Sequence, residues 1–75
     1  MKELIEVIAK ALVSDPDAVV VTEEEVDGEL VLHLSVAPGD MGKVIGKQGR
    51  IAKSIRSVLK VAAIKEDKNA SLDID

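Results

Sequence analysis

Two short apolar runs joined by Asp27-Gly28 constrain the fold of this chain more than any other feature. Residues 18–26 are rich in β-branched side chains, and residues 29–37 place an apolar side chain at every second position. A two-residue Asp-Gly connection between such runs predicts a β-hairpin. It pairs Val21 with Leu34 and gathers one apolar set on a single face. That set is Val19, Val21, Leu30, Leu32, Leu34 and Val36.

Amphipathic helices flank the hairpin on both sides. Residues 2 to about 13 repeat apolar side chains at helical spacing, and Asp15-Pro16-Asp17 ends this segment. A second helical pattern runs from residue 50 to about 65, after a short helix over residues 41–45 for which Asp40 is the expected N-cap. The expected apolar faces are Leu4, Ile5, Ile8, Ala11 and Leu12 in the first helix and Ile51, Ile55, Val58, Leu59 and Ala62 in the last.

The end of the chain predicts one more strand. Residues 70–74 alternate Leu72 and Ile74 with polar side chains, after a polar loop at 67–69. The element order is therefore α-β-β-α-α-β. We expect the α+β class and a single domain over residues 1–75, in which the helices pack on one face of a three-stranded sheet.

Charge is distributed unevenly along the chain, although the formal net charge is −4. Residues 1–38 hold two bases and nine acids, a balance of −7, whereas residues 39–65 hold seven bases and one acid, a balance of +6. A polyanion responds to the local field rather than to the net charge. The middle segment therefore predicts a basic patch suited to nucleic acid, and the alternative is an ordinary solvated helix face.

The segment Gly46-Lys47-Gln48-Gly49 separates the two helices of this basic part. Two glycines three residues apart permit a tight turn and leave no side chain to hold a ligand at a distance. The loop leads into a helix N-terminus, where free N–H groups favour an anion such as phosphate. These features predict a clamp for a phosphodiester backbone, and the alternative is a helix cap and turn with no ligand. The cations in or beside the loop are Lys43, Lys47, Arg50 and Lys53.

The string VIGKQGRIAKSI resembles the signature of KH domains, in which an apolar pair precedes Gly-x-x-Gly and apolar helix residues follow it. The element order matches the type II arrangement, which is mostly bacterial. Over the whole chain the sequence is similar to the small bacterial KH proteins of the KhpA family, most closely over residues 36–56. This resemblance implies binding of single-stranded RNA, with about four nucleotides held by the loop. One departure is Ala52, which stands where a larger apolar residue is usual.

Roles follow from the resemblance position by position. Gly46 and Gly49 would let the RNA backbone approach, while Lys47 and Gln48 would contact phosphates. The assisting cations would be Lys43, Arg50 and Lys53, and the residues that shape the groove or fill the core would be Ile45 and Ile51. Without Phe, Tyr or Trp the chain cannot stack bases on aromatic rings, so we expect weak, low-specificity binding in post-transcriptional regulation or RNA chaperoning.

Val61 and Ile64 fall outside the helix face that is expected to cover the sheet. Surplus apolar side chains on a small domain indicate a partner surface, and the alternative is scattered surface hydrophobes. The KhpA resemblance implies a homodimer or a heterodimer with a larger KH-containing RNA-binding protein. A protein-interaction module in which RNA binding is secondary is therefore the alternative function.

Several classes of function lack the residues they need. The chain has no cysteine and one histidine, His33, so no metal or cofactor site is expected. No pair of carboxylates has a context for acid–base chemistry, and Gly42–Lys47 is too short for a P-loop, so we expect no enzyme. No apolar run reaches roughly 18 residues, and early acids argue against a signal peptide, so the cytoplasm is the expected compartment. His33 is expected to be an ordinary exposed residue of the outer sheet face.

Overall fold

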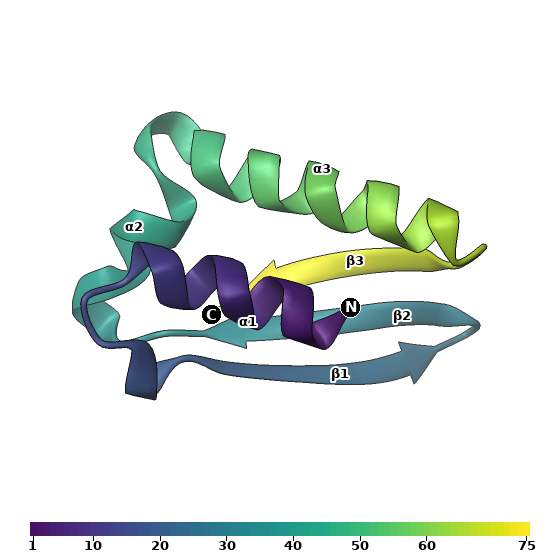
Figure 1. Ribbon diagram of the computed structural model, residues 1–75, viewed down its shortest axis with the longest axis horizontal. Coiled ribbons are helices and arrows are strands. Elements are labelled where there is room, and N and C mark those ends of the chain that lie inside the picture. Colours follow the sequence, from purple (N-terminus) through teal and green to yellow (C-terminus); the bar gives the residue numbers. More distant parts are fainter.

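The computed structural model describes residues 1–75. The predicted α+β class and element order are confirmed (Figure 1). The elements are α1 (Lys2–Leu12), β1 (Val20–Val26), β2 (Glu29–Ser35), α2 (Met41–Ile45), α3 (Arg50–Lys65) and β3 (Asn69–Ile74). Single 3-10 turns lie at Pro16–Ala18, Pro38–Asp40 and Lys47–Gly49. None of the helices is long and apolar enough to span a membrane.

The three strands form one sheet with β2 at its centre. β1 and β2 are antiparallel in the predicted register, with Val21 opposite Leu34. Asp27 and Gly28 both have positive φ, 52° and 80°, which a two-residue hairpin turn that matches the twist of the strands requires. β3 runs parallel to β2, because α2 and α3 carry the chain back to the end of the sheet at which β2 begins, so that Asn69 pairs with Glu29.

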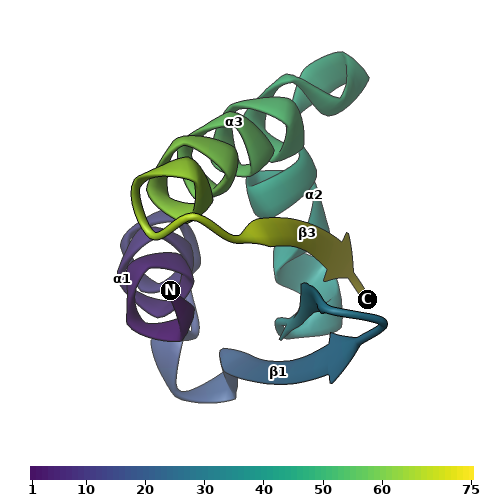
Figure 2. The same ribbon diagram turned by 90° about the vertical axis from the view of Figure 1, so that its right-hand side faces the viewer.

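The helices lie together on one side of the sheet (Figures 1 and 2). α3 runs along β3, and α1 lies over β1 beside α3. The opposite face of the sheet carries no helix. The hydrophobic core fills the space between the two layers, and its largest fully buried side chains are Ile5, Leu32, Leu34, Val44 and Leu59.

The predicted helix faces are partly wrong. In α1 the buried residues are Ile5 and Ala9, while Ala11 is exposed. In α3 the buried residues are Ala52, Ile55, Leu59 and Ala63, whereas Val58 is 44% exposed. The distance between packed elements depends on the side chains at the contact, and small residues permit the closest approach. Alanines are therefore among the buried residues of both helices, while the larger Val58 lies toward solvent.

Two strand boundaries also differ from the prediction. β1 begins at Val20 rather than at residue 18, because Pro16–Ala18 form a 3-10 turn that the Val19 N–H closes by donating to the Pro16 carbonyl. β2 ends at Ser35, two residues early, although Val36 remains buried in the core.

Candidate functional site

The first loop glycine, Gly46, has a conformation that other residues do not adopt. Its φ is 77° and its ψ is 172°, a region that is essentially restricted to glycine. A Cβ at this position would lie 2.6 Å from Ile51 Cγ1 and 2.9 Å from the Ile51 nitrogen. Gly46 therefore serves both the turn and the close packing of α3 against the end of α2.

The second half of the loop turns in the left-handed region. Gln48 has φ 59° and ψ 23°, and Gly49 has φ 73° and ψ 15°. The Gly49 N–H donates to the Gly46 carbonyl at 3.2 Å, which closes the turn. The space beside Gly49 is open, since a Cβ there would meet no atom within 4 Å. The loop stands away from the sheet at one end of the molecule (Figure 1), with Lys47 and Gln48 exposed.

The N-terminus of α3 follows this open surface directly. No side chain caps it and no acid lies in its first turn, so its free N–H groups and the dipole of its 16 residues favour an anion. Arg50 donates from Nη2 to the Gln48 side-chain oxygen at 3.4 Å, which holds the Gln48 amide beside the helix end.

The four cations predicted around the loop are not equivalent. Lys47, Arg50 and Lys53 are exposed and form no ion pair. Lys43 differs, because its Nζ lies 3.2 Å from Asp40 Oδ1 and also donates to the Ser14 hydroxyl. Lys43 is therefore partly neutralised and held against the connection between α1 and β1.

Asp40 does not cap α2 through its side chain, which corrects the sequence prediction. It is only 4% exposed, and its Oδ2 accepts the Asp15 N–H at 3.1 Å. Burial raises the pKa of the Asp40 carboxyl, but the backbone N–H groups of Asp15 and Ser14 and the Lys43 ammonium outweigh this effect, so the pKa is lowered. The carboxylate therefore fastens the start of α2 to the α1–β1 connection.

The predicted apolar residues occupy two kinds of position. Ile45 and Ile51 flank the loop, are half-buried and pack against the core. Val61 and Ile64 are 56% and 67% exposed on α3, as expected. Near them a shallow apolar hollow on α3 is lined by Ser57, Val58, Val61, Ala62 and Lys65.

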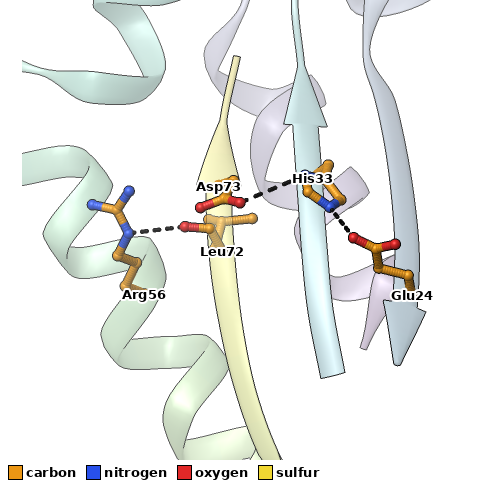
Figure 3. A network of polar contacts seen from close by, with 5 residues as sticks. All are labelled: Glu24, His33, Arg56, Leu72 and Asp73. Carbon is orange, nitrogen blue, oxygen red and sulfur yellow. Dashed lines mark hydrogen bonds and ion pairs between the residues drawn. The ribbon is translucent and has the colours of Figure 1, made fainter. Parts of the chain in front are cut away.

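A groove lies between α3 and β3, but neither Ile45 nor Ile51, which the resemblance assigned to the groove or the core, lines it. Its volume is about 230 Å³, and its lining residues are Arg56, Leu59, Lys60, Ala70, Ser71 and Leu72. Arg56 Nε donates to the Leu72 carbonyl at 3.2 Å across this groove (Figure 3). Arg56 and Lys60 are four residues apart on one helical face, which is the sequence signal that indicates a shared surface.

His33 lies on the uncovered face of the sheet, as predicted, but it is not an ordinary exposed residue. Its side chain is 33% exposed, and it links all three strands (Figure 3). Nε2 lies 3.0 Å from Glu24 Oε1, and Nδ1 lies 3.7 Å from Asp73 Oδ2. The hydrogen bond to Glu24 raises the pKa of His33 above 6.5; partial burial opposes it, and the charges of Glu24, Asp73 and Asp75 add to it.

The fold and the loop together define the class of protein. A sheet in which a parallel third strand follows two helices separated by Gly-x-x-Gly is that of a KH domain in the type II arrangement. The chain belongs to the KhpA/KhpB KH-domain family, whose model matches residues 2–74.

Relatives cover the chain over almost its whole length. It is 58% identical over 74 residues to RNA-binding protein KhpA of Clostridium acetobutylicum, with 99% of each chain covered. It is 55% identical to RNA-binding protein KhpA of Caldanaerobacter subterraneus subsp. tengcongensis, again with 99% of each chain covered. It is 53% identical to RNA-binding protein KhpA of Listeria monocytogenes, with 99% of this chain and 97% of the relative covered.

Proposed function

We propose that this chain binds single-stranded RNA without catalysis and that residues 46–49 clamp the phosphodiester backbone. The observation that carries the proposal is the open, glycine-lined turn that leads into an uncapped helix N-terminus. An anion at this point meets free backbone N–H groups with no side chain in the way. The relatives named RNA-binding protein KhpA support RNA as the polyanion. RNA is also present in the cytoplasm, the compartment expected from the sequence.

Residue roles follow from position. Gly49, beside which the space is open, lets the backbone approach, and Gly46 forms the turn against Ile51, while Lys47 and Gln48 contact phosphates from the tip of the loop. Arg50 and Lys53 extend the positive surface along the first turns of α3, since neither is engaged in an ion pair. The supporting positions are Lys43, which contributes less because of Asp40, and Ile45 and Ile51, which hold the loop on the core.

The groove between α3 and β3 is the proposed place for the bases. Its helical residues belong to α3, the helix that begins at the loop (Figure 1), so a strand held at the loop can continue into the groove. Its apolar lining is aliphatic, and the chain has no aromatic ring on which a base could stack. Without stacking on aromatic rings, contacts to the bases are weak, which favours RNA binding of low sequence specificity. The role we propose is post-transcriptional regulation or RNA chaperoning.

The test is a paired substitution at the loop tip, Lys47→Asp with Gln48→Asp. Both side chains are exposed, so the fold should survive while negative charge enters the clamp. A matched control is Lys68→Asp with Asn69→Asp, which makes the same change of charge at the other end of α3. We expect RNA affinity, measured by fluorescence anisotropy, to fall at least about tenfold in the loop variant and far less in the control. Unchanged affinity in a folded loop variant would show that the clamp is wrong.

A second candidate function is association through α3. The apolar hollow around Val61, together with exposed Ile64, places apolar side chains on a helix face that nothing in the chain covers. We propose a homodimer, or a heterodimer with a larger KH-containing RNA-binding protein, on this face. Ile64→Asp should halve the mass measured by light scattering, while Val20→Asp, on the opposite side of the sheet, should leave it unchanged. A monomer in wild type and in both variants would remove the homodimer.

A further inference from the structure

A second groove lies between α1 and α3, which are neighbours on the same face of the sheet (Figures 1 and 2). Its volume is about 320 Å³, larger than that of the groove beside β3, and the two grooves share no residue. Most of its lining is aliphatic, and these residues are Ile8, Leu12, Ile51, Ile55 and Val58.

The groove is apolar because both helices carry more apolar side chains than the sheet can bury. In α1 the buried residues are Ile5 and Ala9, and Leu12 remains 37% exposed at the end of the helix. In α3 Val58 is 44% exposed. Apolar side chains that are gathered in one place and still in contact with water mark a surface that a ligand can cover.

Arg50 joins this groove to the glycine loop. It is the first residue of α3, its Nη2 donates to the Gln48 side-chain oxygen at 3.4 Å, and its side chain also lines the groove. The other polar lining residue is Ser54, whose hydroxyl donates to the Arg50 carbonyl at 3.0 Å. No carboxylate lines the groove, so a phosphate beside it meets one cation and no anion that would repel it.

We propose that the groove between α1 and α3 is a base subsite, which takes the base of a nucleotide beyond those held by the glycine loop. The subsite rests on the proposed RNA binding and extends the RNA footprint to α1. An unpaired base presents a flat apolar face that aliphatic side chains can cover. The lining is nearly all aliphatic, so the subsite contributes affinity and no base preference. Arg50 attracts the phosphate that links this base to the clamped nucleotides.

An apolar side chain of another protein chain is the competing occupant, because Val58 also lines the hollow proposed for association. Arg50 favours RNA over that occupant. It is the one charged residue of the lining, and it already belongs to the loop that binds phosphate.

The test uses methyl NMR, because the chain has no Phe, Tyr or Trp. Its one imidazole, His33, lies on the other face of the sheet, so a ring-current shift at the groove on addition of RNA reports a nearby base. The RNAs are octamers of adenosine and of uridine and the matching tetramers, which fill the loop alone. We expect the octamers to shift the methyl signals of Leu12 and Val58 and the tetramers to leave both in place.

Leu12→Asn tests the same subsite by affinity. It removes apolar contact area from the groove, and we expect octamer affinity, measured by fluorescence anisotropy, to fall about fivefold while tetramer affinity stays unchanged. Val7→Asn is the matched control, because Val7 is a 68% exposed apolar residue of the same helix that does not line the groove. It should leave both affinities unchanged. Thermal unfolding checks the fold of both variants, and the methyl shifts of wild type depend on neither.

Three results would overturn the subsite. The first is an octamer that binds without shifting the methyl signals of Leu12 and Val58, and the second is an equal loss of tetramer and octamer affinity in Leu12→Asn. The third is a shift of these signals with protein concentration alone and no further shift with RNA, which would assign the groove to association of chains. If binding stays sensitive to Lys47→Asp with Gln48→Asp, the clamp stands and the subsite alone is excluded. If wild type binds neither octamer, the proposed function fails together with the subsite.

Discussion

The Lys43 ammonium lies 3.2 Å from a carboxylate oxygen of Asp40, and it also donates to the Ser14 hydroxyl. Lys47, four residues later, forms no ion pair and stands on the exposed tip of the loop. Two lysines of the same basic segment therefore differ in what they offer a polyanion. Lys43 gives up an existing partner when it contacts phosphate, whereas Lys47 gives up only solvent.

The salt dependence of RNA binding should separate these two lysines. Each phosphate contact to a single strand contributes roughly 0.7 to the slope of log affinity against log salt. We expect Lys47→Gln to lower the slope by about this amount and Lys43→Gln to leave it nearly unchanged. The measurement is an anisotropy titration of one RNA at several salt concentrations. Equal losses of slope in both variants would mean that the ion pair with Asp40 does not keep Lys43 from contacting phosphate.

Replacing the loop glycines by alanine should destabilise the fold unequally. Gly49→Ala places a side chain in open space at positive φ and should cost about 1–2 kcal/mol. Gly46→Ala should cost more, because a glycine-only conformation adds roughly 1–3 kcal/mol and the new Cβ also meets Ile51. Urea unfolding gives both values.

Gly42→Ala is the control for these two variants. Gly42 lies inside α2 with open space around it, so alanine should stabilise the protein by about 0.5–1 kcal/mol. A Gly46→Ala variant as stable as Gly49→Ala would contradict the close packing of Gly46 on Ile51.

Much of the fold could be predicted because its determinants are local. Asp27-Gly28 fixes a two-residue turn, and the turn sets the register of β1 and β2 residue by residue. The buried faces of the helices depend instead on packing. Ala9 and Ala63 are weak signals in a hydrophobic pattern, yet both are buried, because a small side chain permits close approach of packed elements.

The candidate site likewise has one part that the local sequence predicts and other parts that depend on packing. The glycine loop can be recognised in the sequence because its turn places a glycine at each end of four consecutive residues, Gly46 and Gly49. The bond between Lys43 and Ser14 joins positions 29 apart in the chain, so it depends on how the α1–β1 connection packs on α2. The groove that contains Arg56 also requires knowledge of which edge of β3 faces α3, and no local pattern supplies that.

Asp40→Asn should lower stability, and the loss should depend on pH. The folded protein holds the pKa of Asp40 below 3.8, so its contribution is present above that pH and disappears as the pH falls through the folded value. The difference in unfolding midpoint between wild type and Asp40→Asn should therefore be large at pH 6 and shrink below pH 3.8. Asp17→Asn, an exposed acid without a resolved partner, is the control. A difference that does not change with pH would exclude the charge of Asp40 as the cause.

His33 should titrate above its ordinary value, with the opposite dependence of stability on pH. It is the single histidine, so its ring signals in an NMR titration report one group, and the midpoint should exceed 6.5. Because the folded pKa is raised, protonated His33 stabilises the fold fully below pH 6.5 and loses that contribution as the pH rises through the folded value. Wild type should therefore exceed His33→Gln in unfolding midpoint by more at pH 5.5 than at pH 8.5.

Glu24→Gln identifies the source of the His33 shift. The hydrogen bond to Glu24 is its largest cause, and the charge of Glu24 adds to it, while Asp73 and Asp75 remain in the variant. The midpoint of His33 should move down but stay influenced by those two carboxylates, whereas Glu23→Gln, on the other side of β1, should leave it in place. If the midpoint is the same in wild type and Glu24→Gln, the 3.0 Å contact between the ring and Glu24 does not persist in solution.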